Sequence, residues 1–266
     1  MSTEQEYFET NRALWNEKTK HHTGSEFYDM PGFLDGKTSL KEPELALLGD
    51  VKGKSILHLQ CHFGQDSLSL ARMGAKVTGT DISDAAIAYA QQLNEQLGLD
   101  ASFVRSDTYA VPDNVDEQFD IVFASYGVIG WLPDMQRFAE VVARMLKPGG
   151  KFVFAEFHPV RWMYNDDFSE IEFSYFNKEA IIETQEGTYA DRDADMNMEE
   201  IGWNHDFGEI LQSLINAGLR LEVFNEYDYS PYNCFSNMVE VAGGKWQVKG
   251  LEGKVPIMYA LVCHKS

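Results

Sequence analysis

The chain has 266 residues, of which 44% are apolar and 24% charged, the balance of a globular protein in water. Acidic residues outnumber basic residues by 42 to 22, so the formal net charge is −20. This charge repels a phosphate backbone or an anionic bilayer, which argues against nucleic acid and membrane partners.

No apolar run is long enough to span a bilayer, and the N-terminus lacks the apolar core of a signal peptide, so a cytoplasmic location is expected. The cysteines, Cys61, Cys234 and Cys263, lie far apart and form no CxxC pair. We therefore expect free thiols rather than a disulfide framework.

The first fifty residues predict two helices. Thr3 and Glu6 have the spacing of a capping box, and the helix that they open is expected to run to about His21. A loop rich in turn-forming residues separates it from a short helix over residues 43–48.

From residue 55 onward, strands alternate with helices. The predicted strands cover 55–60, 76–81, 101–106, 119–125 and 151–157, and the predicted helices cover 66–73, 83–97 and the stretch from Pro133 to "LKPGG". Ser83 is expected to cap the second of these helices and Gly98 to end it. Alternation of this kind is typical of a parallel, doubly wound sheet.

The alternation breaks after His158. "EIEFSYFN" and "AIIETQEGTYAD" alternate like antiparallel strands and predict an inserted cap. A helix over 206–217 and strands over 219–227 and 256–263 follow, and the two strands are expected to pair antiparallel at the sheet edge. The predicted fold is α/β: a doubly wound, Rossmann-like, seven-stranded, mostly parallel sheet with an antiparallel last strand, an N-terminal helical extension and a small inserted cap.

The loop "QCHFG" follows the first core strand, where an open α/β sheet binds its ligand. A dinucleotide site needs GxGxxG there, so that backbone N–H groups can approach a pyrophosphate. Gln60 and His62 occupy glycine positions, and only Gly64 remains. Bulky side chains obstruct a pyrophosphate more than they obstruct a ligand without phosphate that lies along the loop by its amino-acid end. S-adenosylmethionine (SAM) is such a ligand.

Acidic residues end the next two strands. Asp81 lies 17 residues after Gly64, near the roughly 20-residue offset expected for a carboxylate that accepts hydrogen bonds from ribose hydroxyls. It could instead cap the following helix. Asp107 ends the third strand, where an adenine amino group needs an acceptor, and it could instead be a turn aspartate.

These segments together resemble the class I SAM-dependent methyltransferases. "ILHLQCHFG" aligns with the family's first motif, hydrophobic residues followed by D-x-G-x-G-x-G, and "VTGTDIS" aligns with its ribose motif. "RSDTYAVP" resembles the adenine motif, "FDIVFAS" the fourth strand and "LKPGGKFVFAE" the turn before the fifth. The resemblance covers about residues 54–156, and the flanking segments look like a bacterial small-molecule subgroup.

The resemblance implies SAM as the cofactor and transfer of its methyl group to a small-molecule acceptor, at oxygen, nitrogen or carbon, by in-line displacement. It divides a single domain into an N-terminal helical lid (1–50), a SAM-binding core (51–157), an inserted cap (158–204) and the C-terminal part of the sheet (205–266). We expect a monomer or homodimer.

The expected cofactor contacts combine the motif positions with two aromatic residues of the N-terminal segment, because aromatic faces attract a sulfonium cation. They are Trp15, Tyr28, Gln60, His62, Gly64, Asp81, Ile82, Asp107, Thr108 and Ser125. Trp15 and Tyr28 could instead pack the first helix. The aromatic clusters "RWMYNDDF" and "YSPYNCF" fit either a core or an acceptor pocket.

His58 stands where the family's first motif has an acidic residue, so the family's way of holding the methionine ammonium is altered. His58 could be a satisfied core histidine or a ligand contact. No metal site is expected, because His58 and His62 lack the further ligands that a closed zinc site needs.

His158, directly after the fifth strand, is the first candidate for a catalytic base, and His205 is the second. Catalysis by alignment of the acceptor without any base remains an alternative. Two other functions also stay open: a SAM-binding sensor or partner protein without catalysis, and a nicotinamide-dependent oxidoreductase, against which the loop argues.

Overall fold

The computed structural model describes residues 2–266 and centres on one seven-stranded sheet. The strand order is β3-β2-β1-β4-β5-β11-β8. Its members are β1 (Ser55–Leu59), β2 (Lys76–Asp81), β3 (Ser102–Arg105), β4 (Phe119–Ser125), β5 (Leu146–Phe157), β8 (Leu219–Tyr227) and β11 (Met258–Lys265). Strands β1 to β5 pair parallel, whereas β11 runs antiparallel between β5 and β8. The predicted fold class is confirmed, including its antiparallel last strand.

Helices cover both faces of this sheet, so its strands are apolar on both sides. Helices α7 (Met135–Met145) and α8 (Phe207–Asn216) pack over one face, against side chains such as Leu57 and Val122. Helices α3 (Glu42–Leu48) and α4 (Gln65–Arg72) pack over the other face, against side chains such as Ile56 and Ile121. Side chains at neighbouring positions of one strand thus pack against helices on opposite faces of the sheet.

Helix boundaries follow local capping signals. Helix α5 (Asp84–Leu97) begins where the Ser83 hydroxyl accepts a hydrogen bond from Ala86 N, and it ends at Gly98 in the left-handed conformation, as predicted. Helix α1 (Thr3–His22) begins one residue earlier than expected, because its capping box uses Ser2 and Gln5 rather than Thr3 and Glu6. Two short helices, α2 (Met30–Leu34) and α6 (Val111–Asn114), complete the set.

The cap differs from its prediction. Strand β6 (Ile181–Glu186) falls within "AIIETQEGTYAD", but its antiparallel partner is β7 (Asn197–Gly202), not "EIEFSYFN". The expected strand at "EIEFSYFN" is wrong: that stretch takes part only in an isolated bridge between Tyr164 and Ile171. A second small sheet, β9 (Met238–Glu240) with β10 (Trp246–Val248), lies between β8 and β11 in the sequence and was not predicted.

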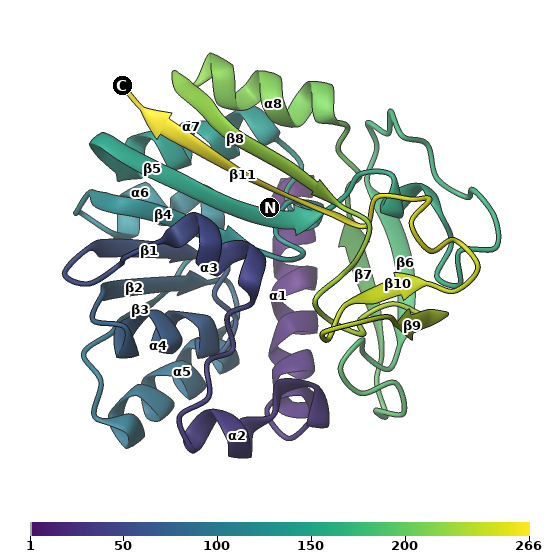
Figure 1. The fold of residues 1–266 in the computed structure, drawn as a ribbon, viewed down its shortest axis with the longest axis horizontal. Coiled ribbons are helices and arrows are strands. Elements are labelled where there is room, and N and C mark those ends of the chain that lie inside the picture. The colour runs from purple at the N-terminus through teal and green to yellow at the C-terminus, as the bar shows by residue number, and fades with distance from the viewer. Residues whose placement is uncertain (1) are drawn as a thin grey trace.

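Helix α1 joins the cap to the core. Figure 1 shows it standing between the large sheet and the two small sheets, beyond the carboxyl ends of the core strands. On the cap side, Asn11 Nδ2 donates to Ile201 O at 2.8 Å, and Ile201 N donates back to Asn11 Oδ1 at 3.1 Å. On the core side, Asn16 Oδ1 accepts from Ser83 Oγ at 2.7 Å. The division of the chain into lid, core and cap stays a prediction.

Candidate active site

A cavity of about 1120 Å³ lies between the carboxyl ends of the core strands, α1 and the β6–β7 sheet. It opens at the switch point, where β1 pairs with β2 on one side and β4 on the other, the usual ligand crevice of such a sheet. Ligand pockets typically measure about 300–1,000 Å³, so this one has room for a cofactor together with a second small molecule. All ten residues expected to contact the cofactor line it: Trp15, Tyr28, Gln60, His62, Gly64, Asp81, Ile82, Asp107, Thr108 and Ser125.

The loop after β1 keeps the backbone path of a glycine-rich loop without most of its glycines. Gln60, His62 and Gly64 have φ values of 51°, 49° and 85°. These three left-handed positions are the ones that glycine occupies in the family's D-x-G-x-G-x-G motif. Because a side chain disfavours this conformation by about 1–2 kcal/mol, Gln60 and His62 strain the loop.

The two unusual side chains have specific contacts that hold them in place. Gln60 Nε2 donates to Thr108 Oγ1 at 3.1 Å and so links the end of β1 to the end of β3. His62 packs edge-on against Trp15, and its Nε2 lies 2.9 Å from His22 Nδ1. Burial lowers the pKa of His62 to about 3 and that of His22 to about 2, so both rings are neutral near pH 7. These two rings therefore add no positive charge that would repel a sulfonium cation.

Asp81 fixes the loop and remains on the cavity wall. Its Oδ2 accepts from His62 N at 2.9 Å, and its Oδ1 accepts from Ser83 N at 2.8 Å. Burial raises the pKa of Asp81 to about 6, although these backbone bonds oppose the rise. Ser83, not Asp81, provides the side-chain cap of α5. Each carboxylate oxygen of Asp81 keeps a lone pair for a ligand hydroxyl, and its ribose role stays a prediction.

Asp107 and His58 each have a structural partner. Asp107 Oδ1 accepts from Ala110 N at 3.1 Å and caps a short turn, yet the residue also lines the cavity. His58 Nδ1 lies 2.8 Å from Ser67 Oγ, and its ring packs on Phe123. Burial lowers the pKa of His58 to about 3. The position that carries an acid in the family's motif is therefore uncharged near pH 7.

The two histidines considered as bases do not lie on the cavity wall. His158 Nδ1 accepts from Val160 N at 3.0 Å, which leaves Nε2 to donate to Glu226 at 2.8 Å. His205 Nε2 donates to a backbone carbonyl at 2.8 Å, and its Nδ1 faces Glu209 at 3.1 Å. Both rings are held within the protein, and their geometry favours a structural role over base catalysis.

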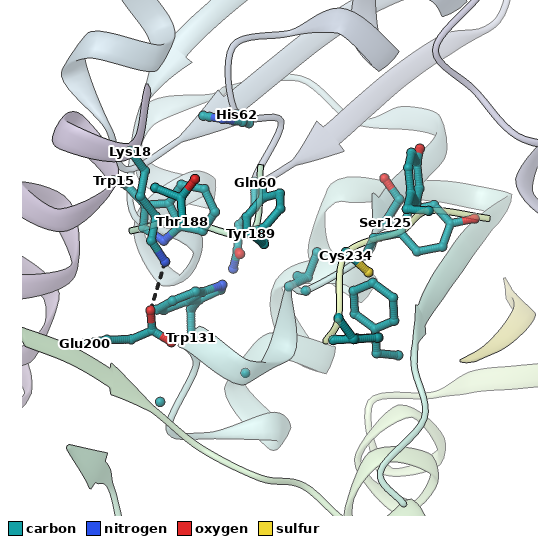
Figure 2. Close-up of a pocket in the computed structure, with 18 of the residues that line it drawn as sticks. Trp15, Lys18, Gln60, His62, Ser125, Trp131, Thr188, Tyr189, Glu200 and Cys234 are labelled. Atoms are coloured by element: carbon teal, nitrogen blue, oxygen red, sulfur yellow. Dashed lines mark hydrogen bonds and ion pairs between the residues drawn. The ribbon is translucent and has the colours of Figure 1, made fainter. Parts of the chain in front are cut away.

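Sequence reasoning missed a cation inside the cavity. Lys18 is only 2% exposed, and its Nζ lies 2.8 Å from Glu200 Oε2 of β7 (Figure 2). The ammonium also sits about 5 Å from the ring centres of Trp15 and Trp131. Only the helical spacing of Lys18 from Leu14 hinted at an inward direction. Its ion pair with Glu200 joins residues far apart in the sequence, and local sequence does not predict such a contact.

Both aromatic clusters contribute to the cavity wall. The lining includes Trp162 and Tyr164 from "RWMYNDDF", and Tyr232, Cys234 and Phe235 from "YSPYNCF". Figure 2 shows Cys234 on the Ser125 side of the cavity, away from Trp15 and Lys18. Within residues 2–266, no group of three or more acidic, histidine or cysteine side chains is arranged to hold a metal ion. Nor does any helix of this range have the length and apolar composition of a membrane span.

Comparison with known proteins identifies the core. A family model described as a methyltransferase domain matches residues 56–150. A ubiquinone biosynthesis O-methyltransferase of Pseudomonas entomophila is 33% identical over 103 residues, which are 39% of this chain and 44% of that protein. The core is a class I SAM-dependent methyltransferase domain. A phthiotriol/phenolphthiotriol dimycocerosates methyltransferase of Mycobacterium tuberculosis is 35% identical over 112 residues, 41% of this chain and 40% of the relative.

The methyltransferase domain thus spans less than half the length of these curated relatives. Solved structures match over more of the chain. A SAM-dependent methyltransferase from Mesorhizobium loti superposes with a TM-score of 0.59 at 20% identity, covering 87% of this chain and 100% of that one. One from Clostridium acetobutylicum gives 0.59 at 15% identity, covering 95% and 99%. At such identities the likeness shows the fold, which therefore extends through the cap region.

Proposed function

We propose that this chain transfers the methyl group of SAM to an oxygen, nitrogen or carbon nucleophile of a small-molecule acceptor, by in-line displacement at the methyl carbon with S-adenosylhomocysteine as the leaving group. One observation carries the proposal: the motif positions of the methyltransferase domain line a single cavity together with α1 and both aromatic clusters. The cofactor and a second molecule can therefore meet in one cavity.

The wall beyond Ser125 supports a small acceptor with an apolar or aromatic part. Phe157, Trp162 and Phe235 pack edge to face there, and all three line the cavity. Curated relatives are named O-methyltransferases, which favours an oxygen nucleophile. The similarity to these relatives is confined to part of the chain, the SAM-binding core. It therefore supports the cofactor more strongly than it supports the acceptor atom. Nucleic acid is not proposed as the acceptor, because a net charge of −20 repels its phosphate backbone.

The mechanism needs little chemistry from the protein, because the sulfonium is already a strong electrophile. Holding the nucleophile in line with the methyl group can lower the barrier by about 7–11 kcal/mol. The neutral rings of His58 and His62 add no positive charge beside the sulfonium, and the aromatic side chains of the wall would help to exclude water. Since neither His158 nor His205 faces the cavity, we propose alignment rather than a histidine base as the main contribution.

Formation of S-adenosylhomocysteine (SAH) tests the proposal. The protein is incubated with SAM and a panel of phenols, catechols, amines and activated carbon acids, and SAH is quantified. We expect SAH above the no-acceptor background with at least one class, and its loss in Asp81→Ala. Tight SAH binding without turnover on any class would instead favour a SAM-binding sensor.

A further inference from the structure

The methionine end of SAM is a zwitterion, and His58 cannot neutralise its ammonium as an acidic residue would. An ammonium taken from water needs acceptors, preferably a carboxylate, and the α-carboxylate needs donors, preferably a cation. A cavity that binds SAM should therefore offer both charges at the methionine end.

The strand order locates this end. From β3 to β4 the strand ends are marked by Asp107, Asp81, Gln60 and Ser125. Four neighbouring strands about 4.8 Å apart span roughly 14 Å, so an extended ligand crosses all four. With adenine at β3 and ribose at β2, the methionine end reaches Ser125 at the end of β4.

Asp66 lies at that place. It belongs to the first turn of α4, lines the cavity, and its Oδ2 lies 3.5 Å from Ser125 Oγ. Burial raises the pKa of the Asp66 carboxyl, opposed by hydrogen bonds from Ser39 and Ser125 and by the charge of Lys41. A ligand ammonium would stabilise the ionised form.

The neighbouring acid cannot take this role. Glu44 is fully buried, is absent from the cavity wall, and accepts from Tyr126 Oη and Lys41 N, each at 2.5 Å. Burial and the charge of Asp66 raise the pKa of Glu44 to about 7. Asp66 is thus the carboxylate at this end that remains open to a ligand.

Lys41 supplies the opposite charge. It lines the cavity, and its Nζ lies 4.8 Å from the ring centre of Tyr232. The nearby Lys37 forms an ion pair with Asp29 at 2.9 Å, whereas no such pair involves Lys41 in the described part of the chain. Within the described residues, an ammonium and a carboxylate that both lack an ion-pair partner therefore line the same end of the cavity.

We propose that Asp66, on α4, binds the ammonium of the SAM methionine end and that Lys41, just before α3, binds its carboxylate. Asp66 would thus supply the negative charge that β1 lacks at His58. The inference rests on the proposed cofactor, and it assigns recognition of the amino-acid part to residues outside the glycine-poor loop.

Three ligands separate the two contacts by calorimetric titration. SAM carries both charges, decarboxylated SAM keeps only the ammonium, and 5′-methylthioadenosine lacks both. Asp66→Asn should weaken SAM and decarboxylated SAM by roughly 10- to 150-fold, the usual loss for a hydrogen bond to a charged group. Lys41→Met should weaken SAM to a similar degree but leave decarboxylated SAM unchanged. Neither variant should change the affinity for 5′-methylthioadenosine.

Asp81→Asn is the matched control, because a ribose contact should affect all three ligands alike. Equal losses for all three ligands in Asp66→Asn would return Asp66 to a structural role, and an unchanged SAM affinity in both variants would overturn the assignment. If Asp66→Asn does not fold, the Lys41→Met pattern alone decides. If wild-type protein binds none of the three ligands, the proposed function itself fails rather than this inference.

Discussion

Asp81→Ala is expected to weaken SAH binding by roughly 5- to 150-fold. Leaving two ribose hydroxyls without a charged acceptor costs about 1–3 kcal/mol. The structure adds a second loss, because Asp81 also holds His62 N and Ser83 N, so the loop after β1 loses an anchor. Calorimetric titration with SAH measures the effect, and a wild-type dissociation constant would show that Asp81 has no part in binding.

Asp81→Asn distinguishes a charge effect from a geometric one. From sequence, asparagine looks mild because one acceptor oxygen remains. In the structure each carboxylate oxygen accepts from a backbone N–H, so one of these donors would face the amide nitrogen instead. We therefore expect Asp81→Asn to lose nearly as much affinity as Asp81→Ala. Near-wild-type affinity would mean that the side chain can turn without disturbing the loop.

Gly64→Ala is expected to lower the free energy of unfolding by about 2–5 kcal/mol. Its φ of 85° costs a side chain about 1–2 kcal/mol, and the added Cβ would lie 2.8 Å from the Phe103 ring, an overlap that typically costs about 1–3 kcal/mol more. Urea unfolding without ligand measures the loss.

Gly98→Ala is the matched control for this prediction. Gly98 is also left-handed, with φ of 61°, but an added Cβ there meets nothing within 4 Å. It should therefore cost only the conformational part, about 1–2 kcal/mol. If Gly64→Ala and Gly98→Ala lose the same free energy of unfolding, the close approach of Phe103 does not explain why residue 64 is a glycine.

Sequence predicted the parallel core well, because its signals are local. Capping residues mark the ends of the apolar runs, as Ser83 and Gly98 do for α5. The motif residues follow the carboxyl ends of parallel strands, which share one edge of the sheet. The eight expected cofactor residues that end or follow core strands reach one cavity for this reason, whereas Trp15 and Tyr28 reach it from α1 and the turn after it. Their individual roles stay predictions.

The remainder depends on long-range contacts. Strand β7 has little alternation of its own; it pairs with β6 and accepts a hydrogen bond from the Asn11 side chain of α1. Strands β9 and β10 have three residues each, too short a pattern to recognise. The direction of His158 was also beyond local reasoning. The strand before it ends at the crevice, but Glu226 on β8 draws the ring away from the cavity. The contacts of Lys18 with Glu200 and of Asp66 with Ser125 likewise form only where separate segments of the chain meet.

The loop after β1, which keeps one glycine among its three left-handed positions, is expected to hold SAM and not a dinucleotide. Calorimetric titration of the wild-type protein with SAH and with NAD tests it most directly. We expect saturable heat from SAH, with one site per chain, and none from NAD. Saturable heat from NAD and none from SAH would contradict the claim.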